Sequence, residues 1–229
     1  KMSHVIKVIT GTIESVVLPS KVDTIVSEWM GYFMVHESML DSVLVARDKW
    51  LRKGGALYPD RARVLACPGD FRPQLEKKAH FWGKDVFGFD FSTLRGDAEA
   101  NLLAESPLAD FCHPGQLLTK KPCVVADWDL ASIPRSEIGR LEGDFISTAT
   151  KSMVVNGFAI WFDVSFPTEP AVVLSTGPRD PRTHWGQSMA LVQQPLKLKK
   201  GQGIDWGIRI AENSQNHRFY DLNVEYGPA

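Results

Sequence analysis

The chain has 229 residues and a mass of 25.5 kDa, and 44% of its residues are hydrophobic, enough for one large domain or two small ones. A formal net charge of -1 argues against a broadly basic nucleic-acid-binding surface. No apolar run approaches the roughly 18 residues of a membrane helix, and the start lacks a signal-peptide pattern. Three cysteines predict no disulfide framework and favour a reducing compartment. We therefore do not expect a secreted, membrane-spanning or disulfide-rich protein.

The first predicted elements are two short apolar runs. Residues 1–11, KMSHVIKVITG, are expected to form a buried strand, with its core over residues 5–11. Val22 to Ser27 is expected to pair with it as a second, parallel strand, buried on both faces. A strand needs a neighbour for its backbone groups. We therefore expect sequence upstream of Lys1 to lie beside the first strand, which makes the chain an internal fragment.

A helix is predicted from Ser38 to Lys53, packed on these strands. Ser38 and Asp41 have the spacing of a capping box at its start. Apolar residues supply one face, and basic residues gather in the last turns, where they complement the helix dipole. Gly54 and Gly55 are expected to end the helix in a left-handed conformation.

From Ala62 onward the pattern changes to short strands separated by turns. Residues 158–166 alternate apolar and polar positions as a half-buried strand does, and residues 220–226 alternate likewise. This pattern indicates an antiparallel barrel or sandwich. Residues 71–107 interrupt it with an aromatic-rich, partly helical insert. Its aromatic side chains could form a small local core or a docking surface, and the sequence leaves both open.

The densest group of chemically active residues is SEWMGYFMVHES, residues 27–38. Glu28 follows the end of a predicted parallel strand, where open α/β sheets place their ligands, and Glu37 precedes the helix. Two convergent carboxylates can act as an acid/base pair or hold a cation, and a guanidinium matches carboxylates bidentately. The two could also be separately solvated loop acids.

Three other motifs carry weaker signals. Thr183-His184-Trp185 lies in a turn, where the histidine could line an active site or be structural. Cys112 and His113, with Cys123 downstream, are too few ligands for a structural zinc site, so no metal is expected. Gly201-Gln202-Gly203 is read as a hairpin turn rather than a phosphate-binding loop.

Together these motifs resemble the protein arginine N-methyltransferase family, in particular its type I members. Residues 27–40, SEWMGYFMVHESML, are similar to the family's double-glutamate loop, and residues 183–185 are similar to its THW loop. Residues 42–62, SVLVARDKWLRKGGALYPDRA, resemble the segment that follows the loop. The segments NGFAIWFDVSFP and VVLSTGP point to one type I branch. The resemblance covers essentially the whole chain.

The resemblance implies an architecture of α/β plus all-β class. Residues 1–61 would be the C-terminal part of a Rossmann-like domain that binds S-adenosylmethionine. Residues 62–229 would be a substrate-binding antiparallel β-barrel, with residues 71–107 inserted as a helical dimerisation arm. The family's glycine-rich cofactor-binding motif is absent from the chain, so we expect the fragment alone to be inactive.

The resemblance also implies roles for individual residues. The expected function is methylation of arginine in proteins, giving mono- and asymmetric dimethylarginine, with S-adenosylhomocysteine as the second product. Glu28 and Glu37 would hold the substrate guanidinium, and Glu37 or a relay through His184 would take up the proton. Tyr32 and Trp185 would form the walls of the arginine channel. The cofactor-side residues would be Ile13 and Glu14 at the adenine, with Met39 and Ser42 nearby.

Partners are implied in the same way. Substrates would be histone tails and glycine/arginine-rich segments, and the extended protein would form a homodimer, without direct nucleic-acid or membrane binding. The protein would be nuclear and/or cytoplasmic. Two alternatives remain. A catalytically silent regulatory subunit is disfavoured by the presence of both glutamates and His184, and a pure ligand-binding β-barrel is disfavoured by the α/β front half and the double-glutamate loop.

Overall fold

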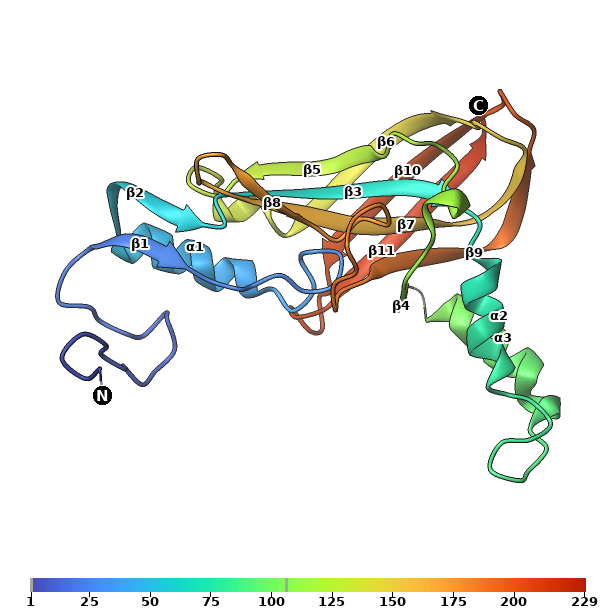
Figure 1. Cartoon of the computed structure of the whole chain (residues 1–229), viewed down its shortest axis with the longest axis horizontal. Coiled ribbons are helices and arrows are strands. Elements are labelled where there is room, and N and C mark those ends of the chain that lie inside the picture. Colours follow the sequence, from blue (N-terminus) through green and yellow to red (C-terminus); the bar gives the residue numbers. More distant parts are fainter. Residues whose placement is uncertain (1, 106) are drawn as a thin grey trace.

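The computed structural model describes residues 2–105 and 107–229. Lys1, the first residue of the expected strand, and Ser106, within the expected insert, lie outside the described residues. The molecule is elongated, with the N-terminal segment at one end and a pair of helices projecting from the other (Figure 1). None of the described helices is long and apolar enough to cross a membrane.

The chain contains three α-helices, three short 3-10 helices and eleven strands in the described ranges. The helices are α1 (Met39–Trp50), α2 (Arg72–His80) and α3 (Arg95–Ala104), with η1 (Ser92–Leu94), η2 (Pro114–Gln116) and η3 (Arg135–Glu137). The strands are β1 (Val22–Val26), β2 (Leu51–Tyr58), β3 (Arg61–Gly69), β4 (Leu108–Asp110), β5 (Cys123–Asp129), β6 (Arg140–Thr148), β7 (Met153–Phe166), β8 (Val172–Ser175), β9 (Gln187–Leu198), β10 (Gly203–Glu212) and β11 (Tyr220–Pro228).

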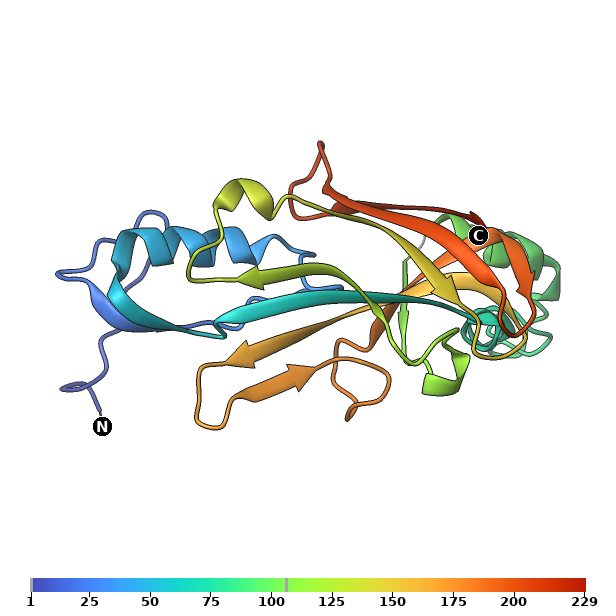
Figure 2. The ribbon, with the colours of Figure 1, turned by 90° about the horizontal axis from the view of Figure 1, so that it is seen from above.

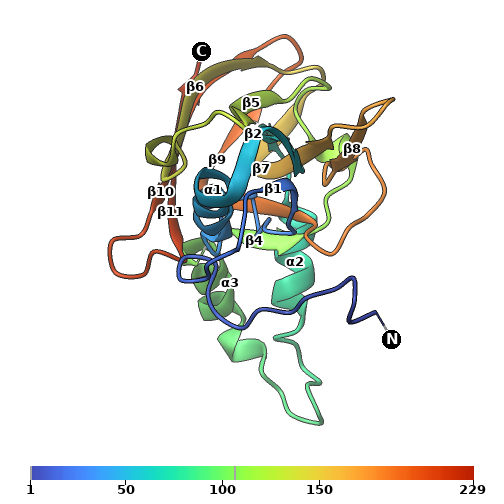
Figure 3. The same ribbon diagram turned by 90° about the vertical axis from the view of Figure 1, so that its left-hand side faces the viewer.

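Most of the molecule consists of two antiparallel sheets. One has the order β11-β10-β6, and the other has the order β4-β9-β7-β3-β5, with β8 paired to β7. Seen end-on, β6, β10 and β11 form one wall and β8 lies toward the opposite side (Figure 3), and the view from above separates the same layers (Figure 2). One hydrophobic cluster fills the space between them and includes Trp128, Phe158, Phe162 and Trp206.

The expectation of a barrel is therefore only half right. The strands after residue 61 are antiparallel, as predicted, but no ladder in the described ranges joins β5 to β6 or β9 to β11. The sheets consequently do not close into a barrel. Burial of the shared core holds the two walls together without a continuous ring of backbone hydrogen bonds.

Strand β7 lies at the centre of the larger sheet and is buried on both faces. Phe158, Ile160 and Phe162 face the large core cluster, whereas Ala159 and Trp161 face a second cluster beside the insert. The predicted strand is confirmed, but its half-burial is wrong because a second layer covers the other face. The alternation over residues 220–226 is confirmed, since inward positions are half-buried and outward positions exposed.

The predicted strand at the start of the chain is wrong. Residues 6–10 have no regular secondary structure, and Val8 is 86% exposed. The expected second strand exists as β1, but its parallel partner is β2, with Ile25 opposite Leu57. It is also not buried on both faces, since Val26 is exposed. An apolar run predicts a strand only where a sheet edge is available to it, and within the described residues none pairs with this one.

Helix α1 forms where predicted but ends earlier, at Trp50. Leu51 is already extended, and β2 includes Gly54 and Gly55, where the register with β1 shifts between the pairs Val22–Leu51 and Thr24–Ala56. Gly54 is left-handed as predicted, with a φ of 76°, but it lies at this irregularity within β2 and not at the end of the helix. The predicted capping box is also wrong. Ser38 adopts a left-handed backbone with φ of 56° and donates its hydroxyl to the His217 carbonyl instead of capping the helix.

The insert is helical, as predicted, and projects from the larger sheet (Figure 1). Trp82 stacks edge-on against Phe81 and Phe91, with ring centroids 5.4 and 6.2 Å apart. At the tip, Phe87 and Phe89 are exposed, with 91% of Phe87 accessible. Phe81 is itself 56% exposed, so these three rings contact one another without forming a buried core, and the tip of the insert is apolar and exposed.

Candidate functional site

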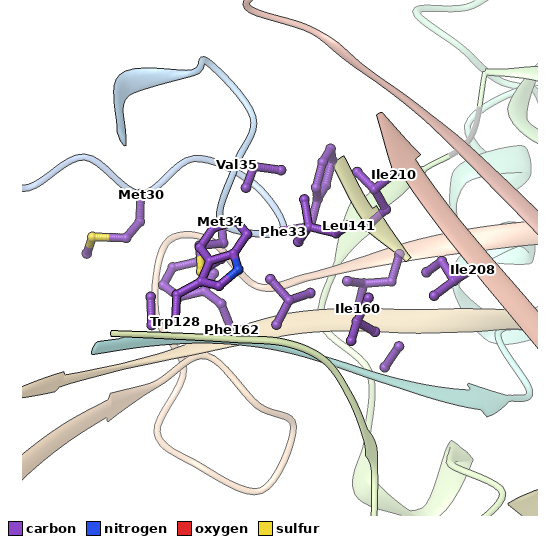
Figure 4. Packing of buried hydrophobic residues seen from close by; sticks show 14 of the residues in the cluster. Met30, Phe33, Met34, Val35, Trp128, Leu141, Ile160, Phe162, Ile208 and Ile210 are labelled. Atoms are coloured by element: carbon purple, nitrogen blue, oxygen red, sulfur yellow. The ribbon is translucent and has the colours of Figure 1, made fainter. Parts of the chain in front are cut away.

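The loop between β1 and α1, residues 27–38, is anchored by its apolar side chains. Trp29, Met30, Phe33, Met34 and Val35 are all buried in the large core cluster. Figure 4 shows Met34 and Phe33 near Trp128 and Phe162, with Val35 beyond them and Met30 farther along the loop. The polar residues between these anchors are left at the surface. Core packing therefore determines where the two glutamates emerge.

Backbone geometry makes this loop compact and strained. Gly31 pairs with Met34 through two backbone hydrogen bonds of 3.0 Å. A Cβ at Gly31 would lie 1.9 Å from the His36 carbonyl oxygen, so this position requires glycine. Glu37 has a φ of 79° and Ser38 a φ of 56°, in the left-handed region that non-glycine residues seldom adopt.

Both glutamates of the predicted clamp are solvent-accessible. Glu28 follows β1 directly, and its Oε1 accepts a hydrogen bond from the Met30 amide at 3.2 Å. Glu37 lies directly before Ser38, the N-cap residue of α1, and its Oε2 is 3.9 Å from the Arg218 Nη2. The Glu37 amide donates to the Arg218 carbonyl at 2.7 Å. Each carboxylate therefore keeps lone pairs free for a ligand.

The THW loop is joined directly to the glutamate loop. The Trp185 indole Nε1 donates to the Met30 carbonyl at 2.8 Å, and its ring packs edge-on against Phe162 at 5.3 Å. The exposed His184 stacks on Trp185, with ring centroids 3.8 Å apart. Residues separated by 155 positions in the chain thus lie at one place. Tyr32, the other predicted wall of the channel, is exposed on the same loop.

Of the predicted cofactor-side residues, Met39 and Ser42 lie in the first turn of α1, and Glu14 contacts Ser42. The Ser42 hydroxyl donates to the Glu14 carboxylate at 2.5 Å, and this hydrogen bond is the main cause that lowers the pKa of Glu14. Lys49 donates to the Glu14 carbonyl. The neighbouring Ile13 and the first helical residue, Met39, are both exposed. The structure therefore brings Glu14 and Ser42 into contact and leaves the two apolar residues open.

A cavity of about 330 Å³ lies beside this pair. Glu14, Ser42 and Asp41 line it from one side, and Arg135 and Tyr220 from the other. Arg135 pairs with Asp41 at 2.7 Å, and burial raises the pKa of Tyr220. The cavity is thus polar and lies where α1 meets the antiparallel sheets.

Sequence reasoning missed the residues that contact the glutamate loop from the other end of the chain. His217, Arg218 and Phe219 lie in the connection between β10 and β11 and touch residues 36–38. His36 itself was also missed. Its Nδ1 is buried without a hydrogen-bond partner, and burial is the main cause that lowers its pKa. No local sequence pattern marks contacts of such long separation.

The cysteines lie away from this site. Cys67 and Cys112 are buried free thiols, and burial raises their pKa to about 11 and about 12. Burial also raises the pKa of the half-buried Cys123. In residues 2–105 and 107–229, no three histidine, cysteine or acidic side chains group as metal ligands.

Sequence comparison identifies the class of protein to which this arrangement of sheets and loops belongs. Residues 60–228 match the family described as the arginine methyltransferase oligomerization subdomain. The chain belongs to the protein arginine N-methyltransferase family.

Individual relatives are moderately similar. Protein arginine N-methyltransferase 1 of Schizosaccharomyces pombe is 38% identical over 228 residues, covering 99% of this chain and 65% of the relative. Protein arginine N-methyltransferase 6 of Xenopus laevis is 35% identical, covering 98% and 66%. The chain therefore spans somewhat less than two thirds of these relatives, and the two identities do not separate one branch from the other.

Solved structures agree with this assignment. The Trypanosoma brucei PRMT1 enzyme–prozyme heterotetrameric complex with AdoHcy contains a chain with a TM-score of 0.84 and 28% identity, matched over 100% of this chain and 70% of that one. The open-conformation Arabidopsis thaliana protein arginine methyltransferase 10 has a TM-score of 0.81 at 28% identity, covering 99% and 71%. Both therefore share the fold along the whole of this chain.

Proposed function

We propose that this chain carries the substrate-side half of a protein arginine N-methyltransferase, which methylates arginine in proteins with S-adenosylmethionine. The observation that carries the proposal is the hydrogen bond from Trp185 to the Met30 carbonyl. It joins the THW loop to the loop that bears Glu28 and Glu37, so residues from both halves of the chain meet at one surface. Family membership supports the same reaction.

Glu28 and Glu37 are assigned to the substrate guanidinium. Arginine stays protonated in proteins, so its nitrogens are poor nucleophiles until charge is drawn away from the reacting one. Two accessible carboxylates can accept hydrogen bonds from the fork of the guanidinium and orient it. His184 and Glu37 are both accessible, and either Glu37 or a relay through His184 takes the proton from the methylated nitrogen.

The residues at the start of α1 and Glu14 are assigned to an adenosine group. The Glu14 carboxylate and the Ser42 hydroxyl lie together beside a polar cavity, and because Ser42 donates its proton to Glu14, the pair offers acceptor oxygens for amino and hydroxyl groups. Ile13 and Met39 would add apolar contacts there. When bound, S-adenosylmethionine supplies the methyl group, whose carbon forms a bond to nitrogen as its bond to sulfur breaks and the electron pair stays on sulfur.

We propose that cofactor binding and substrate binding are assigned to different parts of the chain. Residues 1–61 would complete a Rossmann-like cofactor domain together with a segment like the part of the relatives that this chain does not match. Residues 62–229 would bind protein substrates such as histone tails and glycine/arginine-rich segments, giving mono- and asymmetric dimethylarginine. The exposed aromatic tip of insert 71–107 would serve homodimerisation. The protein would act in the nucleus, the cytoplasm or both.

Methyl transfer from labelled S-adenosylmethionine to an arginine-rich peptide tests this proposal. Two proteins are compared: the 229-residue chain, and an extended protein in which a complete cofactor-binding segment precedes Lys1. We expect turnover by the extended protein, no turnover by the chain alone, and none on a peptide with lysine in place of arginine. An extended protein that binds cofactor but transfers no methyl group would instead indicate the regulatory-subunit alternative.

A further inference from the structure

Three successive residues of the glutamate loop each contact one residue of the β10–β11 connection, residues 213–219. The Glu37 amide donates to the Arg218 carbonyl at 2.7 Å, and the Ser38 hydroxyl donates to the His217 carbonyl. The His36 and Phe219 rings lie 5.4 Å apart. Residue numbers rise on one side as they fall on the other, so the two segments run antiparallel.

The connection is held by its own hydrogen bonds. Asn213 Oδ1 accepts from the amides of Gln215 and Asn216 at 2.9 and 3.0 Å, and Asn216 Oδ1 accepts from the Arg218 amide at 3.1 Å. The strands on either side pair in register up to Glu212 and Tyr220. This turn therefore has a local framework that is independent of the glutamate loop.

The glutamate loop, in contrast, holds a costly backbone at the contact. Glu37 and Ser38 have φ values of 79° and 56°, and such conformations persist only where the surroundings impose them. Ser38 directs its hydroxyl to the connection although it lies at the N-cap of α1. The connection, residues 213–219, therefore holds residues 37 and 38 of the glutamate loop in their left-handed conformation.

The side chains of Glu37 and Arg218 also form an ion pair. The Arg218 Nη2 is 3.9 Å from the Glu37 Oε2, and their side chains are 60% and 53% exposed. Arg218 therefore contacts Glu37 twice. Its carbonyl accepts a hydrogen bond from the Glu37 amide, and its guanidinium carries the charge that pairs with the Glu37 carboxylate. At this distance and exposure the ion pair is weak and screened by water, so the backbone hydrogen bond from Glu37 to Arg218 is the stronger of the two contacts.

We propose that the β10–β11 connection is a positioning element that sets the orientation of Glu37, with Arg218 as its positioning residue. The inference rests on the proposed function, because it assigns Glu37 to the substrate guanidinium. Arg218 does not touch the reacting atoms. It acts through the backbone and carboxylate of Glu37, and a misplaced carboxylate lowers the turnover rate more than it weakens binding.

The decisive variant replaces residues 213–219 by Asn-Gly, a two-residue turn that antiparallel hairpins accept. Hydrogen exchange at the Glu37 amide is measured in the 229-residue chain, and kcat and KM are measured in the extended protein. We expect exchange at Glu37 to rise about tenfold or more, as for an amide that has lost its acceptor. We expect kcat to fall about tenfold to a hundredfold, with a smaller change in KM. Unchanged exchange at Trp206 and Val224 shows that the hairpin still pairs.

Point variants test the side chain of Arg218. Arg218→Gln should lower kcat about twofold to fivefold, and Arg218→Lys should restore most of it. The matched control is Arg52→Gln, whose side chain is also 60% exposed and pairs with Asp23 at 2.8 Å on the β1–β2 sheet. This control should leave kcat unchanged.

The outcomes separate the two proposals. If the parent is active and the Asn-Gly replacement changes neither kcat nor exchange at Glu37, the positioning inference is overturned and the proposed function stands. If the parent with bound cofactor transfers no methyl group, the proposed function fails. Faster exchange at Glu37 in the replacement would then still support its positioning by the connection, and unchanged exchange would overturn that as well.

Discussion

The hydrogen bond between Trp185 and Met30 can be isolated by substitution. Trp185→Phe keeps an aromatic ring against Phe162 but removes the indole N–H that reaches the Met30 carbonyl at 2.8 Å. A partly buried carbonyl left without its partner costs about 1–2 kcal/mol. The smaller ring adds a packing loss of about 1 kcal/mol.

A second tryptophan supplies the matched control. The indole Nε1 of Trp50 is buried without a hydrogen-bond partner, so Trp50→Phe loses ring volume and no hydrogen bond. Urea unfolding of the 229-residue chain, followed by fluorescence, gives the free energy of unfolding of each variant. We expect Trp185→Phe to be less stable than Trp50→Phe by about 1–2 kcal/mol. Equal free energies of unfolding would refute the conclusion that this hydrogen bond ties the two loops together.

Further predictions concern backbone, pH and thiols. Gly31→Ala should destabilise the chain by about 3 kcal/mol or more, because its Cβ would overlap the His36 carbonyl, whereas Gly96→Ala in open space on α3 should be neutral or stabilising in the same urea assay. Burial lowers the pKa of His36 below its ordinary 6.5, so its contribution to stability is present above that pH and is lost as pH falls through the folded-state pKa. His36→Gln should therefore flatten the fall in Tm between about pH 7.5 and 5.5, and an unchanged slope would contradict this reasoning. Iodoacetamide at about pH 8 should modify half-buried Cys123 well before buried Cys112, whose pKa is raised to about 12, and mass spectrometry of the peptides reads the order.

Local sequence patterns predicted the elements whose buried residues recur at a regular spacing within the element. The apolar residues of α1 and the alternation of β11 identified those elements, because the spacing of apolar residues within each element shows which face is buried. The same reasoning failed at the end of α1. Gly54 and Gly55 resemble a helix stop, yet they lie within β2, at the irregularity between the residues that pair with β1.

The candidate site divides in the same way. Glu28 and Glu37 stand close in sequence, and their motif pointed to the loop that carries them. Contact with Trp185 is consistent with the pairing of motifs that the sequence suggested. The sequence did not predict the role of Arg218. It lies 181 positions after Glu37, and its place beside Glu37 depends on how the β10–β11 connection packs against the loop. Spacing rules do not reach such a contact.

The central claim is that Glu28 and Glu37 act on the same guanidinium. The direct measurement is kcat of the extended protein with Glu28→Gln, Glu37→Gln and both changes, and with Glu225→Gln on the exposed face of β11 as a control. We expect each single variant to lose about a hundredfold or more, and the double variant to fall little below the worse single one, because groups that hold one ligand act as a unit. A double variant whose loss equals the product of the two single losses would contradict the claim.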